Sequence, residues 1–281
     1  MEKKSGKEAS MEVLPYSPLA LVLTQIRFPA ELTRLNQKNN EQLDSVMDSL
    51  GYPMSKPQLD ATVQNDPGEG TVQLVFNGSM RVYANLDDSV NVAISGSFIS
   101  LYCIRKNGRI PYAGHEQFSR KLGELADAVS DMVGTIPVSR IGYRYVDQMT
   151  LEEAEKVVSD MCKGFGIHRD ESGKAFIRSS VLDGVFDYAT DEGVSSSSGF
   201  IKEGLHVRSG ILPGGSVVDP AVPARNESSW IIDLDSFSQD SGELNGESVR
   251  GKADALSRRA HEFFYRSAVN SNFVNEYGTQ S

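Results

Sequence analysis

Strands and helices are predicted in the same order twice along this chain, and that repetition limits the folds it can adopt. The shared order is strand, helix, about three strands and helix. In the first half the predicted elements are a strand at 19–28, a helix at 31–50, short strands between 58 and 104, and a helix at 113–133. In the second half they are a strand at 136–149, a helix from Thr150, strands between 175 and 237, and a helix at 249–270. The expected fold class is therefore α+β, a tandem repeat with mostly antiparallel sheets and helices on one face.

The repeat predicts three segments: a disordered polar tail at 1–16, a first repeat at 17–135 and a second at 136–281. One short signature recurs at matching places, because an arginine lies between two bulky apolar residues in Ile26-Arg27-Phe28 and in Tyr143-Arg144-Tyr145. The alternative is one irregular α+β domain without internal symmetry.

Two local motifs predict where elements turn or begin. Asn77-Gly78 lies between two apolar runs and predicts a hairpin turn, because both residues tolerate positive φ. Thr150 and Glu153 have the spacing of a capping box, which predicts the start of a helix.

Charge and cysteine content exclude several classes of function. The net charge is −10 and the isoelectric point about 5.0, which argues against duplex nucleic acid or an anionic membrane as a partner. No run of about 18 apolar residues predicts a membrane span. Cys103 and Cys162 form no CxxC motif, so we expect two reduced core thiols and a cytoplasmic protein.

The strand Arg140–Val146 carries the candidate binding residues. Side chains alternate along a strand, so Arg140 and Arg144 share one face with Gly142 between them, and Tyr143 and Tyr145 take the other face. An arginine row over a glycine gap is suited to a carboxylate or phosphate, because guanidinium groups bind such anions through two hydrogen bonds. A salt-bridged surface is the alternative interpretation.

Arg27 completes the predicted ligand-binding set of Arg27, Arg140, Arg144, Tyr143 and Tyr145. If the first strands of the two repeats lie together, Arg27 and Arg144 should approach each other. Two like charges then require a compensating acid or an anionic ligand.

Signals for catalysis are weak. Asp233 and Asp235 share a strand face and could hold a divalent cation. The histidines His115, His168, His206 and His261 have no zinc-ligand spacing. We therefore expect no catalytic residue, no metal and no cofactor.

Four motifs carry a resemblance. They are Ser17–Pro29, Arg140–Val146, Trp230–Asp235 and His261–Phe273. Together they resemble a sporadically distributed bacterial family of uncharacterised proteins with no established activity. The resemblance implies a bacterial origin and a link to mobile or defence-associated genes, and it transfers no catalytic residue.

The sequence thus favours a non-enzymatic binding module for a protein partner or a small anionic ligand. An accessory role in a bacterial defence or toxin-control system is the expected context. The alternative is a metal-dependent enzyme acting on a phosphorylated or nucleotide substrate. The aromatic residues near the C-terminus favour a core or a contact with a second copy, so homo-oligomerisation stays open.

Overall fold

One large antiparallel sheet organises the chain. The computed structural model describes residues 14, 16–35, 40–66, 71–164, 177–188, 202–239 and 242–278, with the backbone alone for 57–66 and 71–79. Within these residues, nine strands form the main sheet in the order β2-β3-β4-β5-β1-β7-β10-β9-β8, and β6 and β11 form a second, two-stranded sheet. The α+β class and the antiparallel pairing predicted from the sequence are confirmed.

The strand bounds are β1 Leu19–Arg27, β2 Met54–Asp66, β3 Thr71–Ala84, β4 Asn91–Ile94, β5 Phe98–Ile104, β6 Pro137–Val138, β7 Arg140–Met149, β8 Ser180–Asp187, β9 Glu203–Leu212, β10 Ser229–Ser238 and β11 Gly242–Glu243. The helix bounds are α1 Glu41–Ser49, α2 His115–Val133, α3 Leu151–Val157, α4 Asp160–Lys163, α5 Gly246–Phe263, the π-helix η1 Phe264–Ala268, and α6 Asn272–Gly278.

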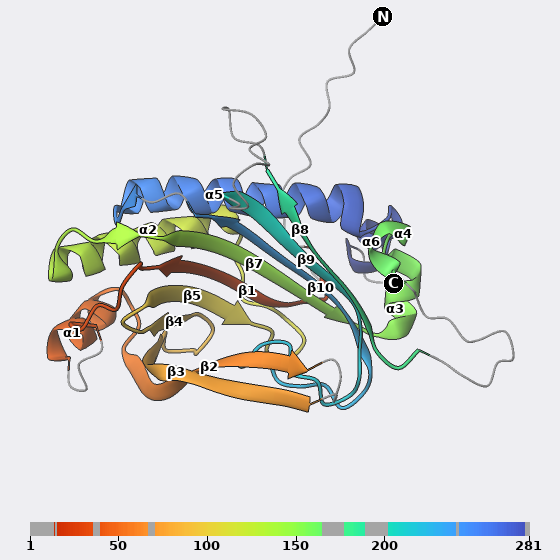
Figure 1. Ribbon diagram of the computed structural model, residues 1–281, viewed down its shortest axis with the longest axis horizontal. Coiled ribbons are helices and arrows are strands. Elements are labelled where there is room, and N and C mark those ends of the chain that lie inside the picture. The colour runs from red at the N-terminus through yellow and green to blue at the C-terminus, as the bar shows by residue number, and fades with distance from the viewer. Residues whose placement is uncertain are drawn as a thin grey trace, which may run out of the picture.

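Strands β1 and β7 lie side by side at the centre of the sheet (Figure 1). They are antiparallel, and the register places Leu23 opposite Arg144 and Arg27 opposite Arg140. On the other side of β1 lies β5, and on the other side of β7 lies β10. Residues from both halves of the sequence therefore share one continuous sheet.

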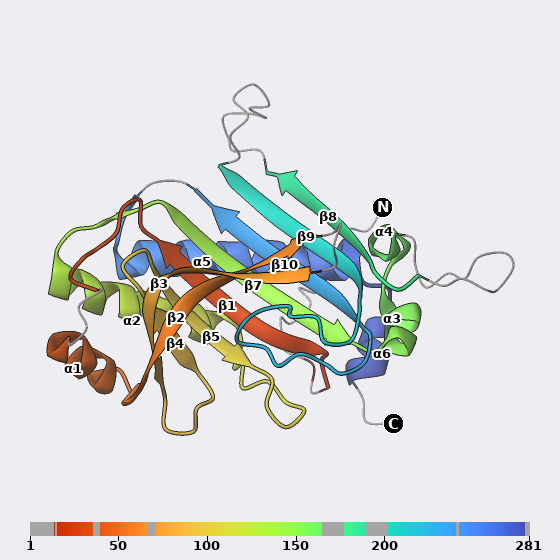
Figure 2. The ribbon, with the colours of Figure 1, turned by 60° about the horizontal axis from the view of Figure 1, so that its bottom comes forward.

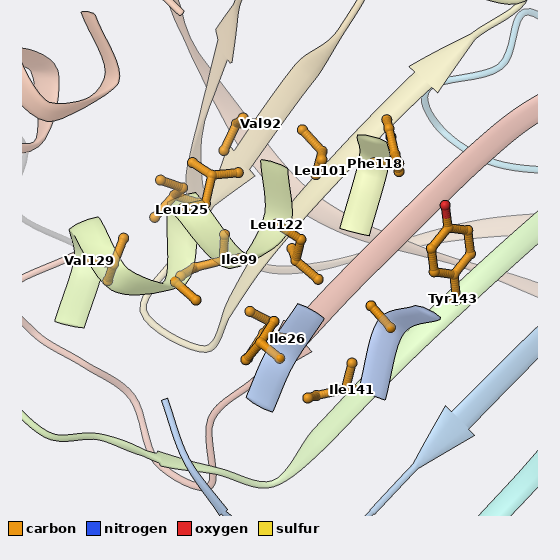
Figure 3. Close-up of a cluster of buried hydrophobic side chains, with 14 of the residues drawn as sticks. Ile26, Val92, Ile99, Leu101, Phe118, Leu122, Leu125, Val129, Ile141 and Tyr143 are labelled. Carbon is orange, nitrogen blue, oxygen red and sulfur yellow. The ribbon is translucent and has the colours of Figure 1, made fainter. Parts of the chain in front are cut away.

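The long helices α2 and α5 cover one face of the sheet, which we call the helix face (Figure 1). Each helix presents one apolar stripe, so burying that stripe against the sheet removes it from water. Figure 3 shows Leu122 and Leu125 of α2 beside Ile26 of β1 and Ile99 of β5, and these side chains belong to the largest buried cluster.

The opposite face, which we call the loop face, is partly covered by the segment 213–228 between β9 and β10 (Figure 2). Val218 and Val222 of this segment pack on Leu21, Val146 and Ile231 of the central strands. In sequence this segment has the composition of a Pro/Gly-rich linker, yet it supplies part of the core.

The Asn77-Gly78 hairpin prediction is wrong. β3 continues through both residues, and its pairing with β2 shifts register there, since Asp60 lies opposite Gly78 and Ala61 lies opposite Phe76. The extra residue is thus accommodated as a β-bulge within a long strand. Asn-Gly can adopt the backbone conformations of a bulge as well as those of a turn. Here β2 continues as the partner strand past these residues, so they form a bulge.

Two helix boundaries also differ from the prediction. α1 begins at Glu41 rather than near residue 31, because the Asn40 side chain accepts a hydrogen bond from Leu43 N and caps the helix there. The last helix does not run unbroken to residue 270. It passes into η1 at Phe264, and α6 follows separately.

The structure also bears on the predicted capping box, the cysteines, the polar tail and the absence of a membrane span. The capping box is confirmed, because Thr150 and Glu153 exchange hydrogen bonds at the start of α3. Both cysteines are free and buried. His168 and most of the predicted tail at 1–16 lie outside the described residues. Within the described part of the chain, no helix has the length and apolarity needed to cross a membrane.

Candidate functional site

Arg144 lies on the loop face and is held by two acids of the chain itself. Its Nε and Nη2 donate to the two carboxylate oxygens of Asp233 at 2.8 and 2.9 Å, and its Nη1 donates to Asp219 Oδ2 at 2.8 Å. Burial alone would raise the pKa of Asp233, but the charge and hydrogen bonds of Arg144, together with the charges of Arg208 and His206, outweigh burial and hold that pKa below its ordinary value. The group thus behaves as an internal ion network.

Arg140 forms a similar pair further along the same face of β7. Its Nη2 donates to Asp235 Oδ2 at 2.7 Å, and its guanidinium lies over the Phe237 ring at 4.9 Å. The gap above Gly142 is therefore filled, since a Cβ there would lie 2.9 Å from Arg140 Nη1 and 3.2 Å from Asp235 Oδ1. The sequence predicts a ligand carboxylate or phosphate in this gap, but the carboxylate found there is the side chain of Asp235.

Arg27 and Arg144 are not the pair that the register brings together. Arg27 lies opposite Arg140, and Arg144 lies opposite Leu23, which is about 13 Å further along the strand. Arg27 is exposed, and its Nε donates to Gln25 Oε1 at 2.6 Å. The expected approach of Arg27 to Arg144 is therefore wrong, and the residue opposite Arg27 in the register is Arg140.

The two tyrosines of the predicted site lie on the helix face, as the alternation requires. Tyr143 is fully buried, and its hydroxyl lies 2.9 Å from that of Tyr112. The Tyr145 hydroxyl lies 2.9 Å from the same Tyr112 hydroxyl and 2.7 Å from Ser257 Oγ. The sheet therefore separates the predicted arginines from the predicted tyrosines.

Beneath α5 and η1, on the helix face, lies a cavity of about 70 Å³, which we call the inner cavity. Polar side chains that line it come from both halves of the sequence: Ser17, Tyr112, His115, Tyr145, Asp147, His261 and Tyr265. Its apolar walls are Leu14, Leu19, Leu234, Ala260, Phe264 and Phe273.

Asp147 is the unusual residue of the inner cavity. It is only 4% exposed, and within the described residues no group donates a hydrogen bond to its carboxylate. Burial raises its pKa from 3.8 to about 7, although the positive charge of Arg105 opposes the rise. A buried carboxylate without a donor is expensive, so such groups concentrate at functional sites.

Arg105 does not neutralise Asp147 by direct contact. Its guanidinium is committed to the backbone, since Nε donates to Leu19 O at 2.9 Å and Nη2 donates to Ser17 O at 3.1 Å. The Asp147 carboxylate therefore senses this charge without a hydrogen bond from it.

The two histidines of the inner cavity differ in their surroundings. His115 Nε2 lies 3.3 Å from Asp254 Oδ1. Burial lowers the pKa of His261, and the neighbouring His115 lowers it further, so His261 is held neutral near pH 7. The His261 ring packs on Tyr265 with ring centres 4.6 Å apart.

Two backbone irregularities border the inner cavity. The pairing of β1 with β7 slips between Leu19 and Leu21, beside Asp147. The α5 helix widens into η1, where Val269 N donates to Phe264 O at 3.0 Å. Bulges and π-turns both re-aim side chains and both recur at functional sites.

No protein-family model matches this sequence, and no curated protein is significantly similar to it. The candidate site therefore rests on geometry.

A second cavity adjoins the first. We call it the outer cavity; it measures about 330 Å³ and shares Leu14, Ser17 and Tyr112 with the inner cavity. Its other lining residues are Tyr16, Gly108, Arg109 and Ile110. A third hollow of about 390 Å³ lies on the loop face, where β2 to β5 and Asp219–Ala221 form its walls.

Metal ligands do not gather in the described ranges. No group of three or more His, Cys, Asp and Glu side chains there could hold a metal ion. Asp233 and Asp235, the sequence candidates, are each engaged by an arginine.

Asp147 does not stand out in the sequence, although a signal for it exists. In the strand 140–149, alternation places residue 147 on the same face as Tyr143 and Tyr145. An acid on an otherwise apolar strand face signals either a buried pair or a site. The histidines and Tyr265 lie on distant helices, and no sequence spacing connects them to Asp147.

Proposed function

We propose that this chain is a non-enzymatic binding module for a small molecule, and that a hydrogen-bond-donating group of the ligand enters the inner cavity and binds Asp147. One observation carries the proposal: a buried carboxylate faces a cavity, and nothing in the described residues donates to it. A bound donor would supply the missing hydrogen bonds and offset the desolvation of the acid.

The proposed ligand and its site differ from the anionic ligand that the sequence predicts at the arginines. Arg140 and Arg144 already bind Asp235, Asp233 and Asp219, so an anion there must displace a carboxylate of the chain. The metal-dependent enzyme is disfavoured for the same reason, since both candidate carboxylates are engaged.

We also propose that 17–135 and 136–281 are copies of one unit. In support, the first strand of each half pairs with the last long strand of that half, β1 with β5 and β7 with β10. The two first strands then meet at the centre, and the inner cavity lies over them. Superposition of the two segments, with β1 placed on β7, tests this.

The cellular role follows only from the family resemblance. We propose an accessory function in a bacterial defence or toxin-control system, in the cytoplasm. The gene neighbourhood tests that context independently of the ligand.

Thermal-shift measurements test the binding function. We expect small amines, amides and alcohols that enter the inner cavity to raise the melting temperature, because a ligand that binds only the folded state stabilises it. Asp147→Asn should abolish the shift, because an amide replaces two acceptor oxygens by one acceptor and one donor. Asp131→Asn, an exposed acid on α2, is the matched control and should keep the shift.

The same variants test whether Asp147 lacks a partner. Because its pKa is raised from 3.8 to about 7, the folded state retains a proton that the unfolded chain releases between these pH values. Asp147 therefore destabilises the wild type increasingly as pH rises through this window, by up to about 4 kcal/mol.

Near pH 4 the Asp147→Asn variant should therefore have the same melting temperature as the wild type. As the pH rises to about 7, the melting temperature of the variant should exceed that of the wild type by a growing margin. If the wild type is the more stable protein at pH 8, Asp147 has a compensating partner in the fold and the proposed site is wrong.

A further inference from the structure

The geometry points to a zwitterionic ligand, a small aminoalkyl carboxylate, with its ammonium group on Asp147 in the inner cavity and its carboxylate on Arg109 in the outer cavity. This inference rests on the proposed function and adds the chemical class of the ligand.

The inner cavity suits an ammonium group in size. A dry cavity of about 150 Å³ accepts a benzene ring, so the 70 Å³ here accommodates only a few heavy atoms. The terminal carbon and nitrogen of an aminoalkyl chain meet that limit. The rest of a ligand must extend past the shared wall of Leu14, Ser17 and Tyr112 into the outer cavity.

The charges of the inner cavity favour a cation. Asp147 carries the only carboxylate among the described lining residues. Arg105 keeps its positive charge, but it does not line the cavity and it donates to backbone carbonyls and not to Asp147. His115 lies 3.3 Å from Asp254, and burial lowers the pKa of His261. A protonated amine next to Asp147 gains a charge-assisted hydrogen bond away from bulk water.

Tyrosine and phenylalanine rings form part of the cavity wall and add to this preference. Tyr112 and Tyr145 meet edge to face, with centres 6.0 Å apart. Phe264, Tyr265 and Phe273 also line the cavity and pack against one another. A cation is attracted to the faces of such rings, whereas an anion is not.

Arg109 provides the second anchor. It follows a tight turn in which Asn107 and Gly108 both have positive φ, and Lys106 and Arg109 exchange backbone hydrogen bonds of 2.8 and 3.0 Å across it. The turn holds Arg109 at the outer cavity. Its side chain is exposed and makes no ion pair within the described residues, so its guanidinium is available to a carboxylate.

Calorimetric titration at pH 8 with a chain-length series tests the inference. The probes are glycine, β-alanine, γ-aminobutyrate, δ-aminovalerate and ε-aminocaproate, each compared with the alkylamine and the carboxylic acid of the same length. We expect one length to bind best and to exceed its alkylamine by roughly tenfold or more, since only the zwitterion gains the second charged contact. The acids alone should not bind.

Variants assign the two ends of the ligand. Arg109→Gln should reduce affinity for the zwitterion to that of the alkylamine and leave alkylamine binding unchanged. Asp147→Asn should abolish both. Arg120→Gln, an exposed arginine on α2, is the control and should change neither.

The outcomes separate the two proposals. If alkylamines or neutral donors bind through Asp147 as tightly as every zwitterion, and Arg109→Gln has no effect, the zwitterion inference is wrong and the proposed function stands. If binding survives Asp147→Asn, both are wrong. If no probe binds, the zwitterion inference is wrong, and the proposed function is wrong as well when the amides and alcohols of the thermal-shift series also fail.

Discussion

Arg144 and Asp147 are three residues apart on β7, and the sheet assigns them opposite roles. Arg144 faces the loop segment and is saturated by Asp233 and Asp219. Asp147 faces the helices and has no hydrogen-bond donor in the described residues. A paired buried charge makes each of its partners necessary to the fold, whereas an unpaired one leaves a place for something else to bind.

Arg144→Ala should destabilise the protein strongly, because Asp233 is 4% exposed and would lose its main counter-charge. Removing one partner of a buried pair typically costs about 3–5 kcal/mol. The measurement is the free energy of unfolding from denaturant titration. Arg120→Ala removes an exposed i,i+4 pair with Glu124 and should cost less than about 1 kcal/mol.

The alternative expectation for Arg144 gives the opposite result. If an external anion were its physiological partner, Arg144→Ala would unfold at the same denaturant concentration as Arg120→Ala and lose only binding. That outcome would restore the arginine site expected from the sequence.

At the scale of elements, the contact between α2 and α5 depends on two glycines. A Cβ on Gly123 would lie 2.7 Å from Gly246 O, and a Cβ on Gly246 would lie 2.6 Å from Gly123 O. Gly246 N also donates to Asp127 Oδ1 at 2.7 Å. The helix backbones therefore meet at van der Waals contact where α5 begins, and this fixes how α5 lies over the sheet and the inner cavity.

Gly123→Ala should separate the helices and lower stability by roughly 1–3 kcal/mol, the usual cost of overpacking. Gly251→Ala is the matched control, because Gly251 is also a helix glycine but a Cβ there would have no other atom within 4 Å. Alanine restricts the backbone of the unfolded chain more than glycine does, so less conformational entropy is lost on folding. Gly251→Ala should therefore raise stability by about 0.5–1 kcal/mol. Opposite signs in thermal melts are the expected outcome; equal effects would contradict the close helix contact.

The whole molecule is organised by one sheet that crosses both halves of the sequence. β1 and β7 each have one neighbour from their own half and one from the other. Separating the halves would open two long central edges, so neither half should unfold alone.

We therefore expect one cooperative transition. Trp230, the only tryptophan, is buried in β10 and reports on the second half by fluorescence. Cys103 is buried in β5 and reports on the first half by thiol reactivity, once Cys162→Ala removes the other cysteine. The two probes should give coincident denaturant midpoints. Distinct midpoints would indicate two independently folding domains.

The sequence alone determined features that depend on near neighbours along the chain. Strand alternation correctly placed Arg140 and Arg144 opposite Tyr143 and Tyr145, because side-chain direction in a strand is a local property. The apolar stripe of α2 and the capping box at Thr150 were predictable for the same reason.

Which side chains meet depends on contacts between residues far apart in the sequence. Asp219 and Asp233 lie 75 and 89 positions from Arg144, and no local pattern reveals that they saturate it. Asn77-Gly78 became a bulge because β2 continues beside it. Asp147 became a candidate site because α5, η1 and the segment before β1 close around it without supplying a donor. Periodicity sets where a side chain points, whereas long-range packing sets what it finds there.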